Sequence, residues 1–146
     1  MIWLNPDKYL NQKYIELRLY APKSEVVYLD FNPLKISNKS DWNPLWEEWH
    51  CYSSPLRIYK QDYNLLLKYF NKIYPTKDAI DNSVSLSSDI CSDNWIIKSD
   101  WQIIVDEIEN DNDLVCENEK IFFLDFLNWI KTALTYTTVI VVEGNQ

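Results

Sequence analysis

The sequence predicts an α+β fold: one domain in which a mixed or antiparallel sheet packs against about three to four helices. The length of 146 residues is typical of one domain, and no linker divides the chain, so we expect residues 1–146 to form one unit. Strand-like segments lie near both ends and helix-like segments lie mainly between them, an order that favours α+β architecture. Hydrophobic residues make up 47% of the chain, enough apolar area for one core without disulfides.

The expected sheet begins with residues 14–20. Apolar side chains alternate there with polar or amphipathic ones, the pattern of a half-buried strand. Residues 21–24 then place proline at the second position of a turn, and residues 25–29 have strong β character. Together these segments predict an N-terminal β-hairpin.

A tryptophan-rich block follows. Asn43 can cap a short helix with Pro44 as its first residue, which places Trp42, Trp46 and Trp49 near one another. Tryptophan at helical spacing is commonly core, but tryptophan is also enriched at interface hot spots. Trp46 and Trp49 are therefore candidate partner contacts as well as candidate core residues.

Residues 61–74 carry apolar side chains at helical spacing, and Pro75 closes the predicted helix. The expected inner face is Tyr63, Leu66, Leu67, Phe70, Ile73 and Tyr74. Residues 76–93 are rich in Ser, Asp and Asn without clear periodicity, so they are expected to form a surface loop.

The next helix is predicted after a buried strand at residues 95–97. Ser99 and Gln102 form a capping box that would start it. Its expected inner face is Trp101, Ile104, Val105 and Ile108. The same spacing places Ile103, Asp106 and Glu107 together on its outer face.

The last two elements are a helix and a strand. A helix over residues 119–134 directs Phe123, Phe126, Leu127, Ile130 and Leu134 inward, and Phe122 and Trp129 widen its apolar surface. Residues 137–142 are mostly β-branched, which is typical of a strand buried on both faces. This strand is expected to lie centrally in the sheet.

Negative charge is concentrated in the C-terminal half. Residues 1–75 carry ten Lys/Arg and eight Asp/Glu, whereas residues 76–146 carry four and fourteen. Half of those fourteen acids lie in one stretch without a basic residue: Asp106, Glu107, Glu109, Asp111, Asp113, Glu117 and Glu119. Such a stretch repels nucleic acid and attracts basic proteins, although a charge run can also be simply a solvated helix face or loop.

Location is predicted from the N-terminus, the apolar runs and the cysteines. The first residues lack the basic start and the apolar stretch of a signal peptide, and no apolar run is long enough to span a membrane. Three widely spaced cysteines favour reduced thiols over a disulfide framework. We therefore expect a cytoplasmic protein without membrane contact.

Several kinds of catalytic or metal site are disfavoured. The single glycine excludes glycine-rich phosphate loops. A nucleophilic triad would have to use the single histidine, His50. The preferred interpretation is that His50 ends a short helix, where the helix dipole mildly favours a cation. The cysteines are too far apart for zinc. Residues 109–120 resemble a calcium loop only at their start, because Leu114 and Lys120 occupy the positions of the required glycine and glutamate. We expect no cofactor, no metal and no enzymatic activity.

A short, acidic, tryptophan-rich chain with an acidic loop resembles the bacterial immunity proteins of contact-dependent growth inhibition and other polymorphic toxin systems. The resemblance is one of size and composition over the whole chain, and the ending at residues 139–146 (VIVVEGNQ) also resembles this class. It implies binding and neutralisation of a cognate toxin domain, often a basic nuclease. The alternatives are an adaptor or regulatory subunit for another basic protein, a nucleic-acid mimic, and a small carboxylate-dependent hydrolase.

The candidate partner-binding residues combine the acidic stretch with nearby apolar side chains. They are Ile103, Asp106, Glu107, Glu109, Asp111, Asp113, Glu117 and Glu119, with Trp46 and Trp49 as further contacts.

Overall fold

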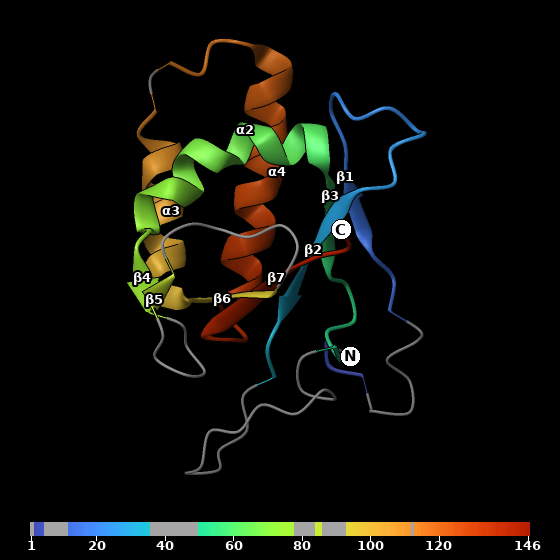
Figure 1. Cartoon of the computed structure of the whole chain (residues 1–146), viewed down its shortest axis with the longest axis vertical. Helices are drawn as coiled ribbons and strands as arrows, with labels where there is room; N and C mark the ends of the chain where they lie inside the picture. Colours follow the sequence, from blue (N-terminus) through green and yellow to red (C-terminus); the bar gives the residue numbers. More distant parts are fainter. Residues whose placement is uncertain (1, 5–11, 36–49, 78–83, 86–92, 112) are drawn as a thin grey trace.

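The computed structural model describes residues 2–4, 12–35, 50–77, 84–85, 93–111 and 113–146 (Figure 1). The predicted helix at Asn43, with Trp42, Trp46 and Trp49, lies outside these ranges. The described elements are β1 (Ile15–Leu17), β2 (Tyr28–Pro33), β3 (Leu56–Tyr59), α2 (Lys60–Phe70), a 3₁₀ turn (Asn71–Ile73), β4 (Thr76–Lys77), β5 (Val84–Ser85), β6 (Asp93–Ile97), α3 (Lys98–Glu109), α4 (Glu117–Ala133) and β7 (Val139–Gly144).

The main sheet has five strands in the order β1-β3-β2-β7-β6. β1 and β3 are parallel, and the other neighbouring pairs are antiparallel. The predicted α+β class with a mixed sheet is therefore confirmed. The C-terminal strand β7 is an interior strand between β2 and β6, as its β-branched composition predicts.

The predicted N-terminal hairpin is wrong, because β3 lies between β1 and β2. Asp62, at the start of α2, accepts hydrogen bonds from the backbone N–H groups of Leu19, Tyr20 and Ala21 at 2.7, 2.6 and 3.4 Å. The Arg18 guanidinium also donates to the carbonyl of Ala21. A turn does form, since the N–H of Glu25 donates to the carbonyl of Pro22 at 3.0 Å. The contacts with Asp62 hold the residues before this turn, and β2 pairs with β3 instead of β1.

The helix predictions are largely confirmed. α2 and the 3₁₀ turn cover most of residues 61–74 and end before Pro75, and the predicted inner faces of α3 and α4 are buried. The capping box at Ser99 is wrong, because α3 starts at Lys98 and Ser99 already lies in its first turn. The predicted loop after Pro75 contains the short paired strands β4 and β5. Within the described ranges, none of the helices has the length and apolar character needed to cross a membrane.

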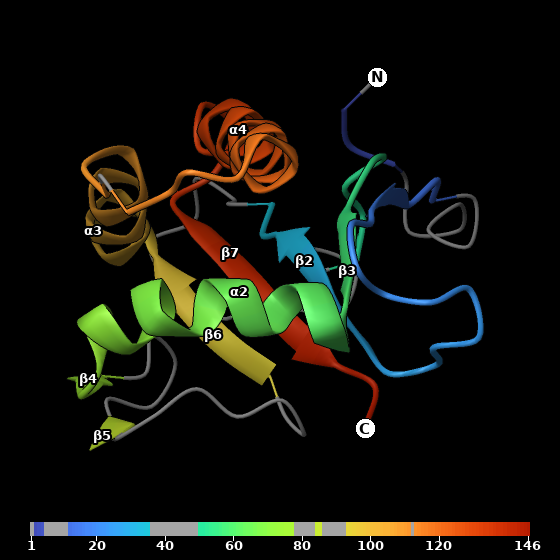
Figure 2. The same ribbon diagram turned by 90° about the horizontal axis from the view of Figure 1, so that it is seen from above.

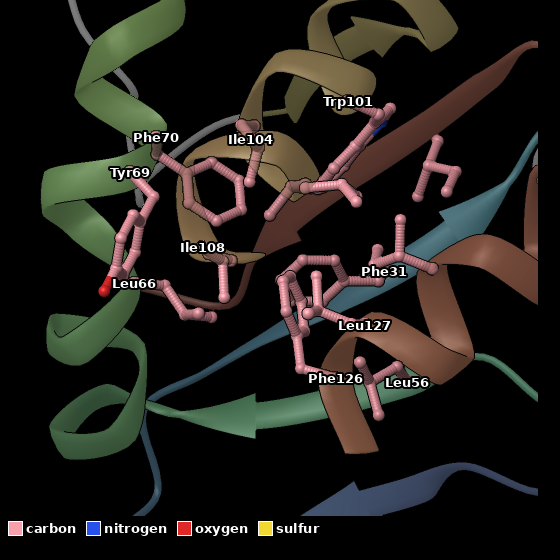
Figure 3. Packing of buried hydrophobic residues seen from close by; sticks show 14 of the residues in the cluster. Phe31, Leu56, Leu66, Tyr69, Phe70, Trp101, Ile104, Ile108, Phe126 and Leu127 are labelled. Carbon is pink, nitrogen blue, oxygen red and sulfur yellow. The ribbon is translucent and has the colours of Figure 1, made fainter. Parts of the chain in front are cut away.

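The core lies between one face of the sheet and the helices α2, α3 and α4 (Figure 2). Fully buried Phe31 of β2 is its central side chain, surrounded by rings from all three helices (Figure 3). Ring centroids lie 6.4 Å away at Phe70 of α2, 6.0 Å at Trp101 of α3, and 5.8 and 6.4 Å at Phe126 and Trp129 of α4. One strand residue thus joins the sheet to every helix of the core.

Phe31→Ala is expected to lower the free energy of unfolding by about 3–5 kcal/mol, because it leaves a cavity where four aromatic rings meet. Urea unfolding followed by tryptophan fluorescence measures the change. Val26→Ala is the control, since Val26 is 73% exposed and its truncation should cost no more than about 0.5 kcal/mol. Equal losses in the two variants would contradict the central role of Phe31.

Candidate functional site

The predicted acidic residues lie around the connection between α3 and α4, at the end of the molecule away from the N-terminus (Figure 1). Ile103 is 43% exposed on α3, about one turn from Asp106 and Glu107. α4 begins at Glu117, two residues earlier than predicted, so the acidic loop is shorter than expected. Glu117 and Glu119 therefore occupy the first helical turn, where the helix dipole stabilises negative charge.

We call this set the acidic surface. It comprises Ile103, Asp106, Glu107, Glu109, Asp111, Asp113, Glu117 and Glu119. These eight residues lie on α3, on the α3–α4 connection and in the first turn of α4, whereas Trp46 and Trp49 lie outside the described residues.

Three of the seven acids form ion pairs within the chain. Lys68 of α2 lies 3.1 Å from Asp111, and Lys131 near the end of α4 pairs with Glu109. Lys120 lies 3.4 Å from Glu117. The acidic stretch has no basic residue of its own, but the fold brings lysines to it from α2 and α4.

The other four acids have no ion pair with any described residue. Asp106 accepts a hydrogen bond from the Gln102 amide at 3.1 Å, and Glu107 and Asp113 are exposed. Glu119 is half-buried. As far as the described residues go, these four carboxylates can receive cations from outside the chain without first breaking an ion pair.

Asp111 fixes the connection between the helices. The Tyr69 hydroxyl donates to its carboxylate at 2.6 Å, and the backbone N–H of Asp113 donates at 2.9 Å. These bonds and Lys68 lower the pKa of Asp111 to about 2, with the Tyr69 bond as the largest cause. A lowered pKa means that this stabilisation is present above the ordinary pKa and is lost as the pH falls from about 4 to about 2.

A surface pocket of about 480 Å³ lies between α2 and the α3–α4 connection. Acids and lysines both contribute to its wall. The described lining residues are Lys68, Tyr69, Lys72, Glu107, Asn110, Asp111 and Asp113. They include no histidine, cysteine or serine, so this lining offers hydrogen-bonding and charged groups for binding and none of the usual nucleophile–base pairs.

A second charged feature, which the sequence prediction missed, crosses the opposite face of the sheet. Directly paired positions on the five strands carry one charged residue each, and this charged row is Glu16, Arg57, Asp30, Glu143 and Asp93. It faces away from the helices, because its β2 member alternates with the core residues Leu29 and Phe31.

Arg57 and Asp30 form the best-satisfied part of the charged row. The guanidinium donates two hydrogen bonds to the carboxylate, at 2.7 and 2.9 Å, and lies over the rings of Tyr14 and Tyr28 at 4.1 and 3.7 Å. Burial raises the pKa of Asp30, although Arg57 opposes this effect. The arrangement is a fork-like pair held between two aromatic rings.

His50 also belongs to this face. It is buried, and its Nε2 lies 3.0 Å from Oε2 of Glu143 on β7. The interpretation of His50 as a helix-terminal cation concerns a helix outside the described residues. His50 and Glu143 are 93 positions apart in the sequence, so no local pattern could predict their contact.

Neither region offers a metal centre in the described part of the chain, where no group of three or more His, Cys, Asp or Glu side chains could hold an ion. Comparisons with protein-family models, curated protein sequences and solved structures give no match.

Tyr69→Phe should raise the pKa of Asp111 from about 2 toward its ordinary value, because it removes the strongest hydrogen bond to the carboxylate. Carboxyl-carbon NMR during a pH titration measures this pKa directly. Tyr59→Phe is the matched control, since the Tyr59 hydroxyl bonds Glu16 instead. An unchanged Asp111 pKa in the Tyr69 variant would show that Lys68 and the backbone N–H of Asp113 are enough to keep this pKa low.

Asp93→Asn should increase the free energy of unfolding at pH 7 by roughly 0.2–1 kcal/mol, because Asp93 lies directly opposite Glu143. Partial burial and Glu143 raise the pKa of Asp93, so its charged form destabilises the fold. The gain should therefore shrink as the pH falls through that raised pKa. Chemical denaturation at several pH values tests this, with Asp125→Asn on exposed α4 as the control. A loss of stability at pH 7 would refute repulsion at this pair.

Proposed function

We propose that the protein is an immunity protein, which binds and neutralises a cognate bacterial toxin domain through the acidic surface. The observation that carries this proposal is that four of the acids, Asp106, Glu107, Asp113 and Glu119, have no ion pair with any described residue. Exposed Ile103 lies about one helical turn from two of them, Asp106 and Glu107. The chemistry fits a basic toxin domain such as a nuclease. A surface of this charge does not suit direct nucleic-acid binding.

The internal contacts of the acidic surface support a binding role. α3 and α4 hold both ends of the surface, and Asp111 fixes the connection through Tyr69 and Lys68. A surface that is already ordered loses less conformational entropy on binding. In this proposal Asp111 positions its neighbours, while the four acids without ion pairs contact the partner.

Electrostatics and apolar contact have separate parts in the proposal. Unpaired carboxylates attract a basic domain over long range and speed its association. The acidic side of the 480 Å³ pocket, with Glu107 and Asp113, offers carboxylates to an arginine side chain of the partner. Ile103 adds an apolar contact among the charges. The protein then acts by covering a toxin surface and needs no catalytic group of its own.

The proposed place of action is the cytoplasm, where the toxin domain would arrive. Among the described cysteines, Cys51 is buried and Cys116 is partly exposed, and neither forms a disulfide. Cysteines without disulfides fit a reducing compartment.

The test uses the toxin domain encoded beside this gene in its host. Co-expression should restore the growth of cells that express the toxin, and the purified proteins should bind with an affinity that falls as salt increases. The double variant Glu107→Lys/Asp113→Lys should lower the association rate constant at least about tenfold, because it reverses two unpaired charges. Stopped-flow fluorescence measures that rate.

The control double variant is Glu25→Lys/Asp125→Lys, which makes the same change in net charge away from the acidic surface. It should keep most of the association rate. Equal slowing in both double variants would show that only net charge matters. Binding without protection from the toxin would favour an adaptor for another basic protein.

A further inference from the structure

The segment around β1 reads almost the same in both directions. Residues 14–20 are Tyr-Ile-Glu-Leu-Arg-Leu-Tyr, which is symmetric about Leu17 in side-chain type. Tyrosines stand at both ends and aliphatic residues stand next to them. The two charged positions around Leu17, Glu16 and Arg18, have opposite sign.

β1 is also an edge strand with an outward-facing backbone. Among the described strands it pairs only with β3, and the N–H of Ile15 donates to the carbonyl of Pro55 at 2.8 Å. In a parallel pair, alternate residues direct their peptide groups to the neighbour. Ile15 and Leu17 therefore face β3, and the N–H and C=O of Glu16 face the open edge.

This edge carries a concentration of exposed apolar side chains. Tyr14, Ile15 and Tyr20 are 37%, 46% and 55% exposed, and Ile121 and Leu124 on neighbouring α4 are 56% exposed each. A small pocket of about 160 Å³ lies between α4 and the segment that follows β1. These five residues are half of the ten large exposed hydrophobic residues in the described chain, so the edge resembles an interface.

We propose that a second copy of this chain pairs antiparallel with β1 along a two-fold axis at Leu17. The two sheets then form one continuous sheet of ten strands, five from each copy. Leu17 lies opposite Leu17 of the second copy, and Glu16 lies opposite Arg18. The outward peptide groups of Glu16 and the peptide groups of Arg18, the first residue after β1, would supply the hydrogen bonds between the copies.

The charges select this register. Glu16 and Arg18 form a 3.7 Å ion pair within one chain, and Arg18 lies over the Tyr59 ring on the face away from the helices. Pairing centred on Glu16 or on Arg18 would place like charges directly opposite, which destabilises a sheet. Pairing centred on Leu17 places opposite charges together on one face and apolar side chains together on the other.

Ile121 and Leu124 explain why the second copy is a better occupant than an unrelated strand. α4 contacts β1, and these two side chains lie on the same side of the sheet as Ile15 and Leu17. The two-fold axis brings the same apolar group from the second copy beside the first. The interaction uses one self-complementary surface and does not depend on the proposed function.

The first test is the molar mass in solution. Sedimentation equilibrium should give twice the chain mass of 17.5 kDa for the wild type. Glu16→Pro removes an outward N–H without removing a hydrogen bond to β3, so it should give a monomer with an unchanged circular dichroism spectrum. Glu16→Ala keeps that N–H and measures the loss of the side chain alone. A monomeric wild type at about 0.5 mM, or a dimeric proline variant, would overturn the proposal; a 0.5 mM solution tests even weak association.

The second test fixes the register by disulfide formation. Residues at a non-hydrogen-bonded antiparallel pair have Cα atoms about 4.5 Å apart, within the range that a disulfide spans. Leu17→Cys should therefore form a covalent dimer on mild oxidation. Ile15→Cys is the matched control, because Ile15 lies opposite Leu19 of the second copy and should form none beyond the wild-type background. Equal cross-linking in both variants, or none in either, would exclude this register.

Discussion

The contact of Phe31 with all three core helices is the constraint on which the rest of the structure depends. Because its ring meets Phe70, Trp101, Phe126 and Trp129, α2, α3 and α4 all pack on one face of the sheet. Two further features of the sheet accompany this arrangement. The charged row occupies the face away from the helices, and the two outer strands, β1 and β6, have no strand beside their outer edges in the described chain.

The helices could be predicted from the sequence because their signal is local. Apolar spacing alone identified the inner faces of α2, α3 and α4, including Trp101 and Phe126, and buried residues occupy those faces. Strand pairing could not be predicted in the same way. The hairpin prediction failed although its turn is present, because β3 lies between β1 and β2, and Asp62, more than forty residues later, binds the backbone after β1. That contact has no periodic signature.

The candidate surfaces also divide into features with a local sequence signal and features without one. The position of the acidic surface followed from the sequence, since its acids are neighbours along the chain and Ile103 shares their helix face. Its partial neutralisation did not, because Lys68 and Lys131 come from other parts of the fold. The charged row could not be foreseen at all. Each strand contributes one member, so the row exists only once the strand order and register are known.

The distribution of internal partners explains why the two charged regions differ in character. On the sheet, the Arg57 guanidinium donates two hydrogen bonds to Asp30, and His50 lies within hydrogen-bond distance of Glu143. These carboxylates therefore interact mainly with groups inside the molecule. At the α3–α4 connection, lysines of the described ranges form ion pairs with only three of seven acids. The chain carries a net charge of −8, and this connection is where the described fold leaves the most neighbouring carboxylates without cations. Under the proposed function, attraction of a basic partner is strongest where the Tyr69–Asp111 hydrogen bond also holds the backbone, so that electrostatic encounter and binding geometry would coincide.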